Sequence, residues 1–143
     1  MTAVGDVWRD ERFLLRDGRE IPHYILILGV DKSYITARLF TTQPHGRPET
    51  LGCQLTVGTR PGHFVGVPNL GRMQKPSWVD LGIFDDIDVF DFARDLSRAR
   101  YTRMGQLDQA RLCAVLMCAI QALDTTQRQE ARMYAARAAL GCQ

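Results

Sequence analysis

The sequence lacks any long hydrophobic run. No apolar stretch approaches the roughly 20 residues that a helix needs to cross a bilayer. The first residues, MTAVGDVWRDER, contain no apolar core of the kind found in signal peptides. Internal repeats and low-complexity segments are also absent. These absences predict a cytoplasmic protein with no membrane partner.

Cysteine is scarce, with four residues in the chain, and no two of them form a Cys-X-X-Cys pair. Cys113 and Cys118 lie five residues apart in a helical apolar pattern, which directs them to different faces of the helix. A zinc site would need two close pairs, whereas small buried thiols are common in a reducing compartment. We therefore expect free core thiols, no bound metal and no other cofactor.

An excess of charge of either sign is also lacking. Lys and Arg total 18 and Asp and Glu total 16, which gives a formal net charge of +2. This balance neither demands nor excludes a nucleic-acid partner, because a basic groove can lie within a balanced total. The 143 residues, 45% of them hydrophobic, suffice for one buried core, and they predict a single domain over residues 1–143.

The longest apolar run in the first half of the chain is PHYILILGV, residues 22–30. It is rich in β-branched residues, too short for a buried helix and interrupted by a glycine, so it predicts a central strand buried on both faces. A charged, glycine-containing loop over residues 9–19 precedes it. A second predicted strand, residues 35–40, follows and leads into Thr41, Thr42 and Gln43. We expect any active site between the entry of the first strand and the exit of the second.

Short strands bounded by turn residues are predicted in the rest of the chain as far as Met104. Their ranges are 5–8, 54–57, 63–67, 77–81, 87–90 and 99–104, with one helical turn at 92–96. At this size a curved antiparallel sheet usually closes into a barrel, which removes its edges. Residues 5–104 are therefore predicted to form a curved antiparallel β-barrel.

Two helices are predicted at the C-terminal end. Asp108 is a suitable N-cap for an apolar helix over 108–123, and Thr126 with Gln129 fits a capping box that opens a helix over 126–140. The first helix is apolar nearly all round, which requires cover by the sheet or by a second subunit and favours a symmetric dimer. The second is expected to dock weakly through its small-residue face, formed by Ala131, Tyr134, Ala135 and Ala138.

The order of these features resembles the MazF/PemK family of toxin ribonucleases. The segments GDVW, PHYILILG, LFTTQ, SWVDL and RMGQLD carry the resemblance, which extends over residues 5–123 and excludes the extension from Asp124. It implies an SH3-like curved antiparallel barrel with a C-terminal helix, assembled as a homodimer. It also implies the toxin component of a bacterial toxin–antitoxin system, a metal-independent endoribonuclease that cleaves single-stranded RNA and binds a cognate antitoxin protein.

The resemblance further implies a catalytic pair: an arginine directly before the proline of the buried strand, and a threonine at the end of the next strand. The threonine corresponds to Thr41, but Ile21 stands before Pro22. Metal-free cleavage with the RNA 2′-hydroxyl as nucleophile needs a base, an acid and positive charge at the phosphate. The candidate catalytic residues are therefore Thr41, Arg19 and His23, and the candidate RNA-binding residues are Arg16, Thr42 and Gln43.

Two functions of different classes remain open. The first is the ribonuclease toxin, and the second is a catalytically inactive MazF/PemK-like barrel that binds RNA or a protein. Ile21 favours the second, whereas Thr41 and the basic loop favour the first. His45 and His63, in loops rich in Gly and Pro, are expected at the surface, and the acidic residues of segment 85–91 are expected in a solvated turn and not around a cation.

Overall fold

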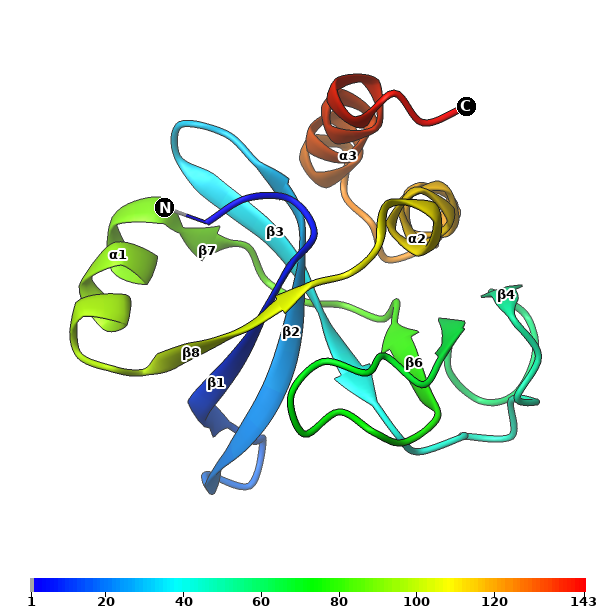
Figure 1. Cartoon of the computed structure of the whole chain (residues 1–143), viewed down its shortest axis with the longest axis horizontal. Helices are drawn as coiled ribbons and strands as arrows, with labels where there is room; N and C mark the ends of the chain where they lie inside the picture. Colours follow the sequence, from blue (N-terminus) through cyan, green and yellow to red (C-terminus); the bar gives the residue numbers. More distant parts are fainter. Residues whose placement is uncertain (1) are drawn as a thin grey trace.

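A computed structural model describes residues 2–143 as a mainly antiparallel β protein with helices toward its C-terminal end (Figure 1). The predicted class, mainly β followed by C-terminal helices, is confirmed. The strands are β1 (Asp6–Leu14), β2 (Glu20–Val30), β3 (Tyr34–Thr41), β4 (Gly52–Gln54), β5 (Gly62–Gly66), β6 (Ser77–Asp80), β7 (Ile87–Asp88) and β8 (Tyr101–Gln106). The helices are α1 (Val89–Ser97), α2 (Gln109–Gln121) and α3 (Gln127–Leu140).

The strands form one open sheet in the order β4-β5-β6-β3-β2-β1-β8, with β7 paired to β3. Within residues 2–143 the two end strands, β4 and β8, do not pair with each other, so the predicted closure into a barrel is wrong. The physical reason is the position of α2, which follows β8 directly and packs against β4 and β5. Apolar helix side chains therefore cover this part of the sheet in place of a closing strand ladder.

β2 lies inside the sheet, between β3 and β1, and contributes to two apolar cores. Leu26 and Leu28 pack on the side of α2 and α3, with residues such as Leu116 and Met133. Ile25 and Ile27 pack on the opposite side, with Trp8, Ile35, Phe92 and Tyr101. The alternation of a strand sends successive side chains to opposite faces, and the prediction of a strand buried on both faces is confirmed.

The segment 87–90 is a strand for only two residues. The Asp88 carboxylate accepts hydrogen bonds from the backbone N–H groups of Phe90 at 2.8 Å and Asp91 at 3.0 Å, so it caps a helix that begins at Val89. The predicted strand over 87–90 is therefore wrong in its second half, and the single helical turn predicted at 92–96 is part of a longer helix, α1. Phe92 of this helix packs edge-on against Trp8, with ring centroids 5.4 Å apart.

α2 begins where its capping signal predicts. The Asp108 side chain accepts a hydrogen bond from the Arg111 N–H at 3.0 Å, and Leu107 and Leu112 on either side of the cap are buried. One face of α2 contacts β4 and β5, and α3 packs beside it. Most of the apolar surface of α2 is therefore covered within one chain.

The start of α3 also follows its sequence signal, but its docking face does not. The capping box of Thr126 and Gln129 is formed. However, the face with Ala131, Tyr134, Ala135 and Ala138, which was predicted to dock, is exposed. The buried residues of the helix are Gln129, Arg132, Met133 and Ala136.

The polar partners of Gln129 and Arg132 explain why α3 docks through the face that carries these two residues. The Arg132 guanidinium donates from Nε to Asp31 at 2.6 Å and from Nη1 to Asp86 at 2.8 Å. Arg38, fully buried on β3, donates from Nη2 to Gln129 Oε1 at 2.9 Å, and burial lowers the pKa of Arg38. Because these groups must be satisfied once they are buried, α3 turns its polar residues inward and is anchored to the sheet by directional bonds.

Gly29 of β2 allows this close approach of α3. A Cβ atom at position 29 would lie 2.7 Å from Arg132 Cβ and 3.2 Å from its carbonyl carbon. We expect Gly29→Ala to lower the free energy of unfolding by about 1–3 kcal/mol, the usual cost of overpacking, as measured by urea denaturation. Gly82→Ala is the control, because the added methyl there meets only the ends of the Asp80 and Arg60 side chains. Equal effects of the two variants would contradict the prediction.

All four cysteines are paired, as Cys53–Cys118 and Cys113–Cys142. The prediction of free thiols is therefore wrong. Cys113 and Cys118 do lie on different faces of α2, because Cys113 bonds to Cys142 in the C-terminal segment and Cys118 bonds to Cys53 of β4. Disulfides persist mainly in oxidising compartments, so the cysteines give no support to the predicted cytoplasmic location.

In residues 2–143, no helix combines the length and the apolar character needed to cross a membrane.

Candidate functional site

A cavity of 290 Å³ lies where β2 begins and β3 ends. Ile25 pairs with Leu39 at this end of the antiparallel β2–β3 ladder, and His23 and Thr41, two residues beyond this pair on their strands, both line the cavity. The structure thus brings together four of the six predicted site residues. The lining residues are Pro22, His23, Tyr24, Phe40, Thr41, Thr42, Gln43, Met73 and Ser77.

A second, larger cavity of 750 Å³ adjoins the first and shares His23, Phe40 and Thr41 with it. Its walls are largely apolar and include Phe13, Leu39 and Phe84. Its polar lining consists of Arg16, His23, Thr41, His45, Arg60 and Asp80. His23 and Thr41 therefore border both spaces, which together offer an open, partly basic site for an extended ligand.

The imidazole of His23 is held in a defined orientation. Its Nδ1 lies 2.8 Å from the carbonyl oxygen of Pro22, and its ring stacks on Phe13 with centroids 4.9 Å apart. A carbonyl oxygen only accepts hydrogen bonds, so we assign the proton of the neutral ring to Nδ1. Nε2 then carries the lone pair, and His23 can act as a base through that atom.

The hydroxyl of Thr41 is available as a donor. Its Oγ1 accepts a hydrogen bond from the backbone N–H of Gln43 at 3.1 Å, and this contact leaves the hydroxyl proton free. Thr42 and Gln43 are exposed just beyond the end of β3. A phosphate oxygen in the smaller cavity would thus meet a hydroxyl donor beside an imidazole.

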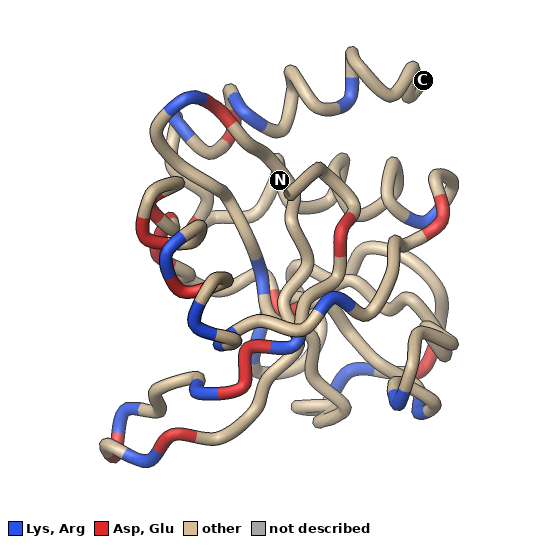
Figure 2. The backbone as a smooth tube through the Cα atoms, turned by 60° about the vertical axis from the view of Figure 1, so that its left-hand side comes forward, with Lys and Arg blue, Asp and Glu red and all other residues tan. Residues whose placement is uncertain are grey.

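The two candidate arginines of the β1–β2 hairpin have different positions. Arg16 lines the larger cavity, and within residues 2–143 no carboxylate lies within ion-pair distance of its guanidinium. Arg19 lies near the tip, with its Nε 2.8 Å from Asp17 Oδ2, and lines neither cavity. Figure 2 shows this hairpin projecting from the body with its charges in alternation. Arg16 therefore supplies positive charge to the cavity, and a catalytic role for Arg19 stays a prediction.

Two loops add residues that the sequence did not single out for the site: His45 lies between β3 and β4, and Arg60 lies between β4 and β5. Arg60 Nη2 lies 3.0 Å from Asp80 Oδ2. The buried guanidinium of Arg47 ties the two loops together, because it donates to the carbonyls of Gln43, Pro44, Arg60 and Pro61. Irregular loops carry no periodic signal, so the sequence offered nothing that placed His45 and Arg60 beside His23.

His63 does not lie at the surface, so that prediction is wrong. It belongs to β5 and is 5% exposed, and burial lowers the pKa of its imidazole. In segment 85–91, Asp86 pairs with Arg132 and Asp88 caps α1. These two carboxylates therefore serve the structure of the sheet and its helices.

No family model, curated protein or solved structure matches the chain. The fold and the site define a mainly antiparallel β protein whose open cavity places an imidazole, a hydroxyl and guanidinium groups together. These groups can transfer a proton, donate a hydrogen bond and neutralise an anion.

Proposed function

We propose that the protein is a MazF/PemK-like endoribonuclease, the toxin component of a bacterial toxin–antitoxin system, and that its sheet is an SH3-like barrel left open where α2 covers it. The observation that supports the activity best is that His23 and Thr41 line the same two cavities, just beyond the last pair of the β2–β3 ladder. In this mechanism His23 Nε2 removes the proton of the RNA 2′-hydroxyl. The oxygen then attacks the adjacent phosphorus and the bond from phosphorus to the 5′-oxygen breaks. The departing 5′-oxygen takes a proton from solvent water, and the His23 imidazolium returns its proton to solvent.

Thr41 and Arg16 act on the phosphate in this proposal. The free hydroxyl proton of Thr41 binds a non-bridging oxygen, and Arg16 neutralises the charge that develops in the transition state. The products are a 2′,3′-cyclic phosphate and a 5′-hydroxyl end. The exposed Thr42 and Gln43 bind neighbouring nucleotides.

Cleavage of a labelled, mixed-sequence single-stranded RNA in the presence of a chelator tests this proposal. We expect fragments with cyclic phosphate ends, and no cleavage of a DNA of the same sequence, because DNA lacks the nucleophile.

Thr41→Ala should slow cleavage about 10- to 100-fold, because a hydrogen bond to a charged group contributes about 1.5–3 kcal/mol. Thr56→Ala, in an exposed loop, is the matched control and should cleave like the wild type. Equal rates for the two variants would contradict the role of Thr41.

A second function is RNA binding without cleavage. It is favoured because the candidate arginines other than Arg16 are held in ion pairs with carboxylates. Arg19 and Arg60 are engaged by carboxylates, and Ile21 precedes Pro22. Among the described residues that line the two cavities, Arg16 is therefore the one arginine without a carboxylate partner. If this function is the correct one, the wild type will leave RNA intact in chelator. It will still bind RNA with a salt-dependent affinity that Arg16→Ala weakens.

The proposal includes assembly as a homodimer and binding of a protein antitoxin. Its support is the exposed face of α3, where Ala131, Tyr134 and Ala135 leave apolar surface uncovered. We expect a dimer in sedimentation velocity at micromolar concentration. A stable monomer at that concentration would contradict this part of the proposal and leave the cleavage assay unaffected.

A further inference from the structure

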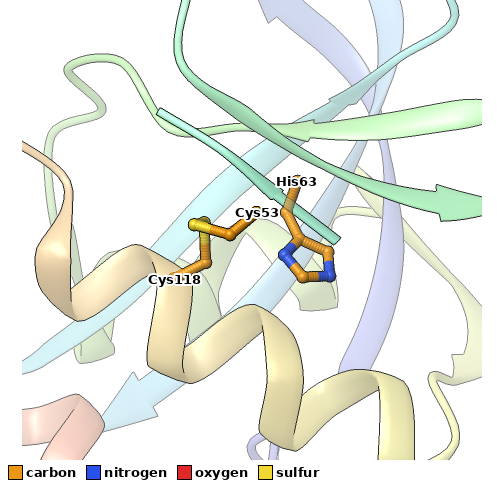
Figure 3. Close-up of side chains that lie close together, drawn as sticks. All are labelled: Cys53, His63 and Cys118. Carbon is orange, nitrogen blue, oxygen red and sulfur yellow. A yellow bond between two sulfur atoms is a disulfide. The ribbon is translucent and has the colours of Figure 1, made fainter. Parts of the chain in front are cut away.

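Three potential metal ligands meet away from the proposed RNA site. The sulfur atoms of Cys53 and Cys118 and a ring nitrogen of His63 all lie within 4.8 Å of one another, the one such group found in residues 2–143. They come from three elements, β4, α2 and β5. Figure 3 shows the imidazole beside the disulfide, with one ring nitrogen on the side of the sulfur atoms.

His63 has a buried nitrogen without a partner. Its Nδ1 is inaccessible to solvent and makes no hydrogen bond, and the residue is 5% exposed. Such groups are rare in folded proteins, because an unsatisfied buried polar atom costs about 1–3 kcal/mol. A ligand in the cluster would give this nitrogen a partner.

We propose that reduction of the Cys53–Cys118 disulfide converts this cluster into a zinc site, with the two cysteine thiolates and the His63 imidazole as its protein ligands. Thiolate and imidazole are the donors that Zn²⁺ prefers. Tetrahedral Zn–S and Zn–N bonds of about 2.3 and 2.0 Å place the ligand atoms about 3.5–3.8 Å apart. Since the three atoms already lie within 4.8 Å, small side-chain rotations suffice once the sulfur–sulfur bond is broken.

A dithiol can serve as the reductant that converts the disulfide into two thiols. The dithiol passes two electrons and two protons to the disulfide, and it becomes a disulfide itself while Cys53 and Cys118 become thiols. Zn²⁺ then replaces the two thiol protons, which leave to solvent. His63 binds through its lone pair, and an exogenous water molecule takes the fourth position, which the exposed side of Cys53 leaves accessible.

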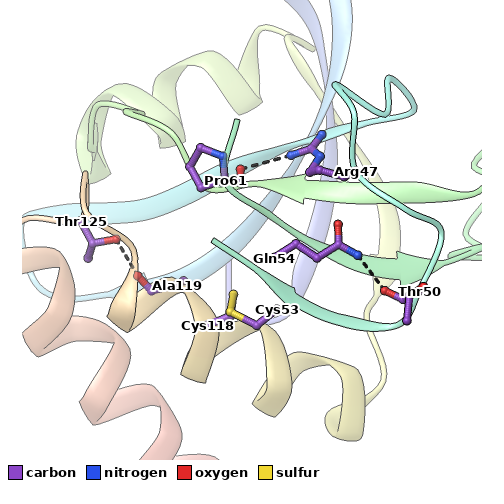
Figure 4. The surroundings of a disulfide bond; sticks show 8 residues. All are labelled: Arg47, Thr50, Cys53, Gln54, Pro61, Cys118, Ala119 and Thr125. Atoms are coloured by element: carbon purple, nitrogen blue, oxygen red, sulfur yellow. Dashed lines mark hydrogen bonds between the residues drawn. A yellow bond between two sulfur atoms is a disulfide. The ribbon is translucent and has the colours of Figure 1, made fainter. Parts of the chain in front are cut away.

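The backbone around the disulfide is held independently of it (Figure 4). On the β4 side, Gln54 donates to the carbonyls of Thr50 at 2.8 Å and Pro48 at 2.9 Å. On the α2 side, the Thr125 hydroxyl donates to the Ala119 carbonyl at 2.6 Å. The ligands therefore remain in position after reduction, and zinc would keep β4 tethered to α2 in a compartment where the disulfide is lost.

Cobalt binding to the full-length chain tests the proposal. The protein is reduced with a phosphine, which does not hold the metal as a dithiol does, and is titrated with Co²⁺ under anaerobic conditions. We expect one Co²⁺ per chain, with sulfur-to-cobalt charge-transfer absorption, displacement by Zn²⁺, and no such absorption from the oxidised protein. Absence of this absorption from the reduced, folded wild type would overturn the proposal.

Single substitutions identify the ligands. Cys53→Ser, at an exposed position, and His63→Gln should each weaken the metal affinity by at least about tenfold, and Cys53→Ser should also reduce the charge-transfer intensity. Cys113→Ser is the matched control, because it removes a thiol of the other pair and should leave the cobalt spectrum unchanged. Binding by Cys53→Ser with wild-type affinity and intensity would overturn the proposal even if His63→Gln did not fold.

Discussion

Replacing His23 by alanine should slow RNA cleavage by about 10²- to 10⁴-fold, the range that a positioned acid or base contributes. The expectation follows from the orientation of the ring. Nδ1 is bound to the Pro22 carbonyl at 2.8 Å, and Phe13 fixes the ring plane, so Nε2 is left free for the 2′-hydroxyl. Initial rates on a single labelled RNA, measured at saturating enzyme, would give the effect on the chemical step.

His45→Asn is the matched control for His23→Ala. His45 lines the larger cavity only, and its positive φ of 49° is one that asparagine tolerates. We expect this variant to lose less than about tenfold in rate, the effect of one neutral hydrogen bond. A His23→Ala rate equal to that of wild type would exclude His23 as the base.

Replacing Arg132 by alanine should lower the free energy of unfolding by about 3 kcal/mol, the lower end of the cost of breaking a buried ion pair. Its guanidinium is almost fully buried and bonds Asp31, Asp86 and the Thr36 hydroxyl. The lower end applies because the Asp31 side chain is 45% exposed and regains water. Urea denaturation followed by far-UV circular dichroism measures the change.

Arg128→Ala provides the comparison on the same helix. Arg128 is exposed, so its loss should change the free energy of unfolding by no more than about 0.5 kcal/mol. Similar losses in the two variants would mean that α3 docks through its apolar contacts alone.

Acidic pH should reduce the difference in free energy of unfolding between the wild type and Arg132→Ala. The hydrogen bond from Arg132, followed by those from the backbone of Tyr34 and Ser33, lowers the pKa of Asp31 from 3.8 to about 2. A carboxylate with a lowered pKa stabilises the fold above its unfolded pKa, and this contribution is lost as the pH falls through the folded value. The stability difference between wild type and Arg132→Ala should therefore be complete above about pH 4 and shrink toward pH 2. A difference that grows on acidification would contradict this account of the pair.

The sequence alone determined the elements whose signals are local. Asp108 and the Thr126–Gln129 box cap their helices through bonds to residues at most three positions away, so the pattern contains both partners. The apolar run of β2 was recognisable for a similar reason, because its length, its glycine and its β-branched residues are all contained in the run itself. Part of the site followed as well, since consecutive antiparallel strands place the start of β2 beside the end of β3, where His23 and Thr41 line one cavity.

Only the tertiary structure decided the features whose partners lie far apart in the chain. The docking face of α3 depends on Arg132 and Asp31, which are 101 residues apart. The state of the cysteines depends on Cys53 and Cys118, which are 65 residues apart. The open sheet likewise depends on α2 packing against β4 and β5. In each case the local pattern is compatible with more than one outcome. The outcome depends on groups that approach one another only when the sheet is formed, because buried charges and polar atoms need partners there.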